Sequence, residues 1–267
     1  MQLLKIDGLR IEQMWPKIIQ SPCARENYLL FCDWRYGALM VLFINDIPVT
    51  ILDADEPPES GRYNHSLDAA REPITQSKLI NHVWVKNANE KDFDIILGFL
   101  NSKVPTNILS VIISTAGVMS TKQYFRKKFK IVKAAGGLIR KKDKFLMIYR
   151  MKKWDLPKGK REKNEKYKQT AVREVLEECN VTVKIGRKIC TTWHTYTMNK
   201  NAMLKKTRWY LMDCVDDTRM KPASEEDIEE IRWMNPKEVY HALEHSYQSI
   251  SYVLEQYYEK IELKSIQ

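Results

Sequence analysis

The spacing of hydrophobic and polar residues changes along the chain. Met40 opens a stretch of alternating apolar positions, and the Asn45-Asp46 pair within it predicts a two-residue hairpin turn. Apolar residues at helical spacing over residues 89–103 precede a β-branched run at residues 108–115. A hairpin, a helix and a strand in this order are typical of a small α/β domain.

After residue 130 the pattern becomes rich in strands. One helix interrupts the strands and two more follow them, which is typical of an α+β fold with helices packed on a mixed sheet. The predicted strands cover residues 131–140, 144–150, 183–197 and 207–215, and the predicted helices cover residues 166–179, 236–245 and 247–261. We therefore expect an appendage of uncertain order at residues 1–39, a small α/β domain of unknown role at residues 40–125 and a C-terminal domain at residues 126–267.

Composition places the chain among soluble globular proteins. Hydrophobic residues make up 44% and charged residues 29% of 267 positions, which is ordinary for a folded protein. The first residues mix charges into their apolar positions, unlike a signal peptide, and no apolar run approaches the ~20 residues of a transmembrane helix. The five cysteines lack C-x-x-C spacing, so neither a disulfide framework nor a zinc site is indicated. We expect a cytoplasmic protein that does not enter a membrane.

The net charge of +10 is concentrated in the C-terminal part. Residues 126–168 contain 18 basic and four acidic residues, a balance of +14 in one short stretch. A solvated lysine-rich face or a nucleic-acid patch would explain such a run on its own. Because the run leads directly into the segment described next, a polyanionic small molecule is the favoured ligand.

The predicted helix at residues 166–179 has two chemically different faces. With about 100° of rotation per residue, its apolar residues gather on one side and Glu174, Glu177 and Glu178 gather on the other. Carboxylates this close repel one another. A solvent-exposed face would tolerate them, but a hard cation such as Mg²⁺ would bind them through oxygen ligands.

The glutamates stand in a longer pattern of fixed spacing. Gly159, Glu165, Arg173, Glu174, Glu177 and Glu178 fit G-x5-E-x7-R-E-x2-E-E, which resembles the Nudix box. Asn180 stands where that box normally has glycine, a mild change because asparagine also adopts the left-handed conformation past a helix end. The resemblance extends from residue 131 to the final helices, and the stretch from Trp154 to Gly159 is similar to the loop of members that act on polyphosphates.

The resemblance implies a fold, a reaction and a metal. The expected fold is an α/β/α sandwich with a mixed sheet, and the expected reaction is hydrolysis of a phosphoanhydride bond with Mg²⁺, for which Mn²⁺ is an acceptable substitute. It implies that Glu177 and Glu178 are the main metal ligands, that a backbone carbonyl at Gly159 closes the site, and that Glu174 is a further ligand or the base that activates water.

The remaining motif residues have supporting roles in this resemblance. Arg173 is expected to orient Glu174 through a charge-assisted hydrogen bond, and Glu165 to support the loop before the helix. The family often places one more acidic residue outside the box, and the acidic run that starts at Glu225 offers candidates. We take Glu226 and Glu230 as the two candidates, with a solvated acidic loop as the alternative.

The basic residues beside the motif indicate the substrate class. Several lysines near one loop favour a substrate with several phosphates over a sugar nucleotide with two. We expect a nucleoside polyphosphate, a dinucleoside polyphosphate or a related metabolite. The candidate substrate-binding residues are Lys152, Lys153, Lys158, Lys160 and Trp154, although an aromatic residue at strand spacing is more often part of a core than a base-stacking surface.

A protein without turnover is the alternative from another functional class. A Nudix-like domain that senses a nucleotide, or whose basic surface binds RNA in a regulatory role, would share much of this sequence pattern. The complete acidic face of the helix favours catalysis, so a nucleic-acid partner is an alternative that is not favoured, and the oligomeric state is left open.

Overall fold

The computed structural model describes residues 5–6, 9–10, 40–102, 107–116 and 118–265. Two short strands, β1 (Lys5–Ile6) and β2 (Leu9–Arg10), are the described part of the predicted appendage, and the rest of residues 1–39 lies outside the described residues. Among the helices that the structure describes, none is long and apolar enough to cross a membrane.

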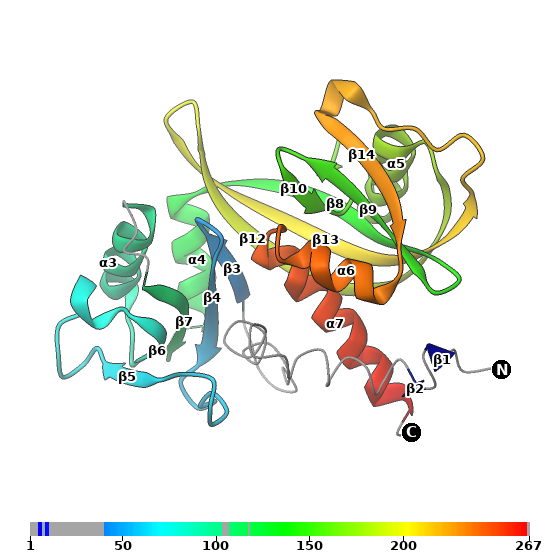
Figure 1. Ribbon diagram of the computed structural model, residues 1–267. Helices are drawn as coiled ribbons and strands as arrows, with labels where there is room; N and C mark the ends of the chain where they lie inside the picture. The colour runs from blue at the N-terminus through cyan, green and yellow to red at the C-terminus, as the bar shows by residue number, and fades with distance from the viewer. Residues whose placement is uncertain (1–4, 7–8, 11–39, 103–106, 117, 266–267) are drawn as a thin grey trace.

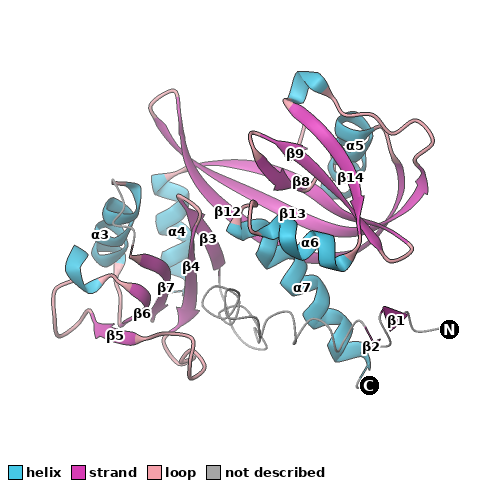
Figure 2. Ribbon diagram, viewed as in Figure 1, coloured by secondary structure: helices cyan, strands magenta, loops and turns pink. Residues whose placement is uncertain are grey.

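One sheet of 12 strands runs through the described chain from residue 40 onward (Figures 1 and 2). Its order is β10-β9-β8-β13-β12-β3-β4-β7-β6-β5, with β11 paired to β8 and β14 paired to β9. The first half contains β3 (Met40–Ile44), β4 (Ile47–Asp53), β5 (His65–Asp68), the 3-10 helix η1 (Gln76–Lys78), β6 (Asn81–Lys86), α3 (Glu90–Asn101), β7 (Ile108–Thr115) and α4 (Val118–Lys128). We call these elements, residues 40–128, the N-terminal unit.

The second half carries the longest strands and the predicted acidic helix. It contains β8 (Lys130–Lys141), β9 (Lys144–Arg150), β10 (Lys153–Asp155), β11 (Lys158–Lys160), α5 (Tyr167–Cys179), β12 (Thr182–Met198), β13 (Asn201–Asp216), the 3-10 helix η2 (Ser224–Glu226), β14 (Ile228–Met234), α6 (Pro236–Leu243) and α7 (Gln248–Ser265). The strand predicted at residues 207–215 is part of β13, which begins at residue 201. Charged side chains interrupt the alternation in the first part of β13, so the pattern did not predict that part.

The N-terminal unit begins with the predicted hairpin. Asn45 and Asp46 both have positive φ (50° and 66°), as a tight turn between β3 and β4 requires. The strands β4, β7, β6 and β5 are then parallel to one another. Helices α3 and α4 share one apolar core with these strands, in which Phe93 of α3 packs against Tyr124 and Phe125 of α4.

The second half is a sandwich of helices and sheet. Ala171 and Val175 of α5 are fully buried in one core on the sheet, and Val239 of α6 and Val253 of α7 are fully buried in a separate core. The sheet between them is mixed, because β13 runs parallel to β8 and antiparallel to β12. The predicted α/β/α sandwich with a mixed sheet is therefore confirmed.

A short parallel pairing joins the two halves of the sheet. Strand β3 pairs with β12 only at Trp193 opposite Leu42 and His194 opposite Phe43, and the rings of Phe43 and His194 stack with centroids 5.3 Å apart. The boundary predicted between residues 125 and 126 falls within α4. The division into separate domains stays a prediction.

Candidate active site

Helix α5 and strand β11 form the centre of the candidate site. Strand β11 pairs antiparallel with the middle of β8, which places Lys158 opposite Gly136 and Gly159 opposite Ala135. The carboxylate of Glu174 lies against Gly159, in the space that a side chain at this position would fill. Glycine is therefore required at residue 159 if Glu174 is to keep its place.

Arg173 binds several acidic residues at once. Its Nε lies 2.9 Å from Oε1 of Glu165, its Nη2 lies 3.0 Å from Oε1 of Glu174, and its Nη1 lies 2.6 Å from Oε2 of Glu177. Nη2 also donates a hydrogen bond to the backbone carbonyl of Lys160 (3.0 Å). These bonds raise the pKa of Arg173, most of all the one to Glu165. A single guanidinium thus ties the helix to β11 and to the loop between them.

Glu165 links that loop to the first turns of α5. Its carboxylate accepts hydrogen bonds from Arg173, from the hydroxyl of Thr170 (2.9 Å) and from the backbone N–H of Glu162 (3.1 Å). The bond from Arg173 is the largest cause that lowers the pKa of Glu165 to about 2. Glu165 is therefore ionised throughout the neutral range, where it supports the loop.

Two carboxylates of α5 are buried. Glu178 is 2% exposed, accepts a hydrogen bond from the backbone N–H of Lys158 (2.9 Å) and lies 3.4 Å from Nη1 of Arg150. Burial raises its pKa to about 7, against the opposing effect of Lys158. Burial also raises the pKa of Glu174, and Arg173 opposes that shift. Both carboxylates would be stabilised in their ionised form by a further positive charge.

The end of α5 explains why Asn180 is tolerated. Asn180 has left-handed backbone angles (φ 52°, ψ 42°), its N–H donates to the carbonyl of Leu176 (2.8 Å), and its side chain donates to the carbonyl of Arg219 (2.7 Å). Asparagine adopts this conformation more readily than most residues. The glutamates before it are therefore held on a regular helix.

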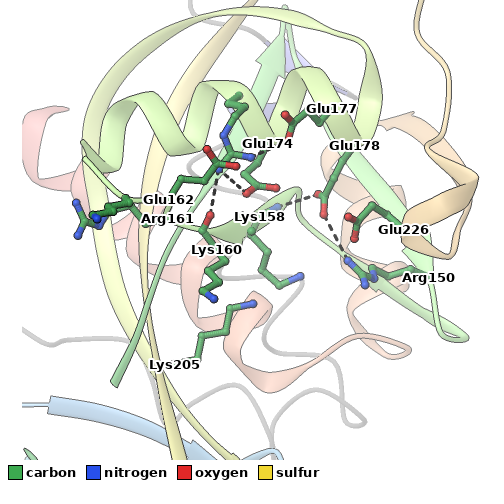
Figure 3. A pocket seen from close by; sticks show the side chains of 13 residues that line it. Arg150, Lys158, Lys160, Arg161, Glu162, Glu174, Glu177, Glu178, Lys205 and Glu226 are labelled. Carbon is green, nitrogen blue, oxygen red and sulfur yellow. Dashed lines mark hydrogen bonds and ion pairs between the residues drawn. The ribbon is translucent and has the colours of Figure 1, made fainter. Parts of the chain in front are cut away.

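A cavity of about 820 Å³ opens in front of these carboxylates. Figure 3 shows the glutamates of α5 along one side of the cavity and the side chains of Lys158 and Lys205 on the other. The lining residues are Arg150, Lys158, Gly159, Lys160, Arg161, Glu162, Lys163, Arg173, Glu174, Glu177, Glu178, Lys205 and Glu226. A ligand here would meet carboxylates on one side and cations on the other.

Lys205 reaches this cavity from the middle of β13. Burial, followed by the neighbouring charge of Lys158, lowers its pKa to about 8. Its ammonium group is therefore charged at neutral pH but only partly hydrated. Such a group gains more from an anionic ligand than a solvent-exposed lysine does.

The donor set at this site fits a divalent cation such as Mg²⁺. Every donor is oxygen, which hard cations prefer, and burial keeps the pKa of the two buried carboxylates, Glu174 and Glu178, raised although neighbouring cations oppose the shift. Glu177 is 56% exposed and turns to Arg173. Among the described residues, no group of three or more His, Cys, Asp or Glu side chains stands close enough to hold a metal. The fit therefore rests on two buried carboxylates, with Glu177 as a third that would have to turn inward.

A family model decides what kind of domain this is. The NUDIX domain model matches residues 130–256, which begin at β8 and end within α7. Residues 130–256 are a NUDIX domain. The match supports a hydrolase that acts on pyrophosphate bonds, as the spacing of the motif predicted.

Solved structures of NUDIX proteins are similar to this domain at low identity. A NUDIX hydrolase from Nitrosomonas europaea is 24% identical over 48% of this chain and 70% of its own, with a TM-score of 0.40. An Ap4A hydrolase from C. elegans is 21% identical over 46% of this chain and 93% of its own, with a TM-score of 0.37. A MutT NUDIX hydrolase from Burkholderia pseudomallei is 19% identical over 48% of this chain and 98% of its own, with a TM-score of 0.37. Each match leaves about half of this chain uncovered.

Some of the predicted site residues of the NUDIX domain line the cavity, and others do not. All the motif residues except Glu165 line it, and so do Lys158, Lys160 and Glu226. Glu165 stands behind Arg173, and Glu230 lies away from the cavity, where it binds Arg232 (2.7 Å).

Three predicted substrate-binding residues do not line the cavity. Lys153 lies 3.4 Å from Asp46 and 4.5 Å above the ring of Tyr247, and Trp154 packs against Tyr149 with ring centroids 5.0 Å apart. Lys152 is exposed in the turn before them and has positive φ (62°). Lys153 and Trp154 therefore pack within the protein, and none of the three residues lines the cavity.

Sequence reasoning did not select several residues that line the cavity. Arg150, Arg161, Lys163 and Lys205 are the cationic ones, and Glu162 is the acidic one. Arg150 ends β9 beside the predicted loop, so its position next to that loop was a usable signal. Lys205 carried no such signal, because it lies in the part of β13 that the alternation did not predict.

Proposed function

We propose that the NUDIX domain hydrolyses a phosphoanhydride bond of a nucleoside polyphosphate or dinucleoside polyphosphate, and that the reaction depends on Mg²⁺. The observation that carries this proposal is that carboxylates and cations face each other across one cavity. The buried carboxylates of α5 lie on one side, and the cations of β9, β11 and β13 lie on the other. A chain of phosphates bound by cations would bring an anhydride bond beside carboxylates that can activate water.

Burial and the sequence motif together indicate which residues would bind the metal. Glu178 and Glu174 would hold Mg²⁺, with Glu177 and the backbone carbonyl of Gly159 as further ligands. Mn²⁺ is an acceptable substitute. When bound, the cation neutralises phosphate oxygens and makes a water molecule more acidic.

The protein side chains would perform the proton and binding steps. The oxygen of a water molecule attacks one phosphorus, the bond from that phosphorus to the bridging oxygen breaks, and the proton of the water passes to a carboxylate oxygen of Glu174. Arg173 lies 3.0 Å from Glu174 and fixes the direction of its carboxylate. Glu165 in turn fixes Arg173, so it acts as a positioning residue.

The number of cations supports a substrate with more than two phosphates. Arg150, Lys158 and Lys205 stand around the buried carboxylates, and Lys160, Arg161 and Lys163 extend the positive wall along β11 and the loop after it. Arg150 and Lys158 are already paired with Glu178 and Asp155. The other four cations form no ion pair with a described carboxylate, and two phosphates would not match all four of them. A polyphosphate chain would pair with them along its length.

A panel of nucleotides tests the proposal. Each compound is incubated with the protein and Mg²⁺, and released phosphate is measured with and without a coupled phosphatase. We expect turnover of at least one compound with three or more phosphates, and a KM that rises with salt because screening weakens the positive wall. No product from any anhydride would contradict the proposal and would favour the alternative of a nucleotide-sensing protein.

A further inference from the structure

A second group of cations lies outside the catalytic cavity. Its members are Arg126 of α4, Lys133 of β8, Lys188 of β12, and Lys206 and Arg208 of β13, and we call them the basic strip. None of them forms an ion pair with a carboxylate among the residues that the structure describes. Five cations without an acidic partner create a strongly positive surface.

Strand register places the four cations of β8, β12 and β13 on one face of the sheet, where Lys188 stands opposite Tyr210, four residues after Lys206. Lys206 pairs with Lys133 on one side and with Trp193 on the other, so the three residues form a row across β8, β13 and β12. Arg208 lies two residues further along β13 and therefore points to the same face. The cations of three strands thus meet on a shared surface.

The basic strip lies on a stretch of the sheet that no helix of the described residues covers. On this face Leu204 belongs to the core beside α4, and Tyr210 belongs to the core beneath α5. Lys206 and Arg208 stand between these two residues of β13. Helices α4 and α5 lie at opposite ends of this stretch of β8, β12 and β13 (Figure 1). The described part of the chain therefore leaves the strip open to a partner.

The cations are close enough to repel one another. The pKa of Lys206 is lowered, first by burial and then by Arg208, Lys188, Lys133 and Arg126. Such repulsion weakens the folded state unless an anion binds there.

Aromatic rings lie among the cations. Nζ of Lys206 lies 4.6 Å above the ring of Trp193, and the guanidinium of Arg208 lies 3.9 Å above the ring of Tyr167 at the start of α5. Both rings are half-buried. A cationic groove with aromatic rings and guanidinium planes is the combination that binds single-stranded nucleic acid, because the cations contact phosphates and the flat groups stack on bases.

The basic strip also leads to the rim of the catalytic cavity. Arg161 lines that cavity and its guanidinium lies 5.5 Å from the ring of Tyr167, which Arg208 contacts from the strip. The two positive regions therefore meet at one aromatic residue. An extended polyanion could lie along the strip with one end close to the cavity.

From this geometry we infer that the basic strip is a binding surface for single-stranded nucleic acid. The five cations would contact the phosphodiester backbone, and the half-buried rings and the Arg208 guanidinium would stack against bases. The surface lies beyond the catalytic residues, so the inference does not depend on which nucleotide the NUDIX domain hydrolyses.

Fluorescence anisotropy tests this inference with a probe that has no anhydride bond. The probe is a 3′-fluorescein-labelled oligouridylate of about 12 nucleotides with a free 5′-hydroxyl, a length that such surfaces commonly cover. If five phosphates are neutralised, log Kobs should fall with log salt at a slope of about −3.5, so that binding weakens about 100-fold between 50 and 200 mM salt. Binding that does not depend on salt would overturn the inference.

A pair of matched variants locates the surface. Lys133→Glu with Lys188→Glu reverses two exposed cations of the strip and should weaken binding at least 10-fold, while nucleotide hydrolysis stays unchanged. Lys144→Glu with Lys221→Glu makes the same change of net charge at exposed lysines outside the strip and should have much less effect. Equal loss in both variants would overturn the assignment to the strip, and glutamine replaces glutamate at the same positions if charge reversal impairs folding.

Two further ligands distinguish nucleic acid from other anions. An abasic oligomer of the same length has the phosphates without the bases and should bind about 10-fold more weakly, because each stacked base contributes roughly 1–3 kcal/mol. Equal binding of the abasic oligomer would overturn the assignment to nucleic acid and indicate a general polyanion site. Tighter binding to vesicles that contain phosphatidylserine would assign the strip to a membrane surface instead.

Discussion

The carboxylate of Asp46 accepts a hydrogen bond from the backbone N–H of Gln248, the first residue of α7 (2.9 Å). It also lies 3.4 Å from Nζ of Lys153 in β10. Burial raises the pKa of Asp46, while the bond from Gln248 and the charge of Lys153 oppose that shift. The hairpin of the N-terminal unit therefore caps a helix of the NUDIX domain and binds the loop that leads to the motif.

Substitution of Asp46 should show how strongly this contact stabilises the protein. Asp46→Gly keeps the left-handed backbone (φ 66°) but removes the cap, and should lower the free energy of unfolding by about 0.5–2 kcal/mol. Asp46→Asn keeps an oxygen that accepts the bond from Gln248 and should lose less. Urea unfolding measures both variants, and equal losses would mean that the charge pair with Lys153, not the cap, is the stabilising contact.

Removal of the Glu178 charge should abolish most turnover while the fold is retained. Glutamine still accepts the hydrogen bond from the backbone N–H of Lys158, so the melting temperature should stay close to that of the wild type. Metal ions supply several kcal/mol to the transition state, and each ~1.4 kcal/mol changes a rate tenfold, so kcat should fall by about 100-fold or more. Glu229→Gln, at an exposed acid outside the cavity, is the control, and equal kcat in the two variants would place the site elsewhere.

A methyl group at Gly159 should displace the carboxylate of Glu174. Gly159→Ala puts a carbon atom in the space of that carboxylate, and a displacement of ~1 Å can lower a rate on the order of 100-fold. Gly98→Ala is the matched control, because its added carbon meets no atom within 4 Å in α3 and should stabilise the helix by about 0.5–1 kcal/mol. Steady-state kinetics compares the two variants, and an unchanged kcat in Gly159→Ala would show that Glu174 is not needed where it stands.

The affinity for a polyphosphate substrate should fall above pH 8. Burial lowers the pKa of Lys205 to about 8, so its charge is present below that pH and is lost as the pH rises through it. KM should therefore increase between pH 7 and pH 9.5 in the wild type. Lys205→Arg keeps its charge over this range and should flatten the profile, whereas Lys205→Met should show a high KM at every pH. A wild-type KM that does not change above pH 8 would remove Lys205 from the substrate contacts.

Acid should destabilise the wild type more than a Glu165→Gln variant. The folded pKa of Glu165 is about 2 against 4.5 for the ordinary group, because Arg173 and two further donors bind its charged form. Its contribution to stability is thus complete above pH 4.5 and is lost as the pH falls from 4.5 to 2. Melting temperatures over this range should drop more steeply for the wild type, and parallel curves would contradict this role for Glu165.

The carboxylate face of the site could be predicted from the sequence because it lies on one helix. The helical period alone places Glu174 and Glu178 on a common face, and the structure buries both against β11. Arg173 was predicted to orient Glu174, and the two side chains lie 3.0 Å apart, whereas the contact of Arg173 with Glu165 was not predicted. Local periodicity is sufficient to predict the residues of a site when all of them belong to one element and its preceding loop.

The cationic side of the site could not be predicted in the same way. Lys153 begins β10 and Lys158 begins β11, only five residues apart, yet Lys153 points to Asp46, which is distant in sequence, and Lys158 lines the cavity. Lys205 reaches the cavity only because β13 pairs with β8 and β12 in a particular register. Such positions depend on long-range pairing, for which a single sequence carries no local signal.

The pairing of β3 with β12 has a consequence for any attempt to isolate the NUDIX domain. Without β3, the backbone N–H and C=O groups of β12 near Trp193 would form an open sheet edge. Leu204, now fully buried beside the N-terminal unit, would lose its cover. A fragment that starts at residue 130 would thus expose an unpaired edge strand and an apolar patch to other copies of itself. The N-terminal unit therefore also protects the NUDIX domain against aggregation.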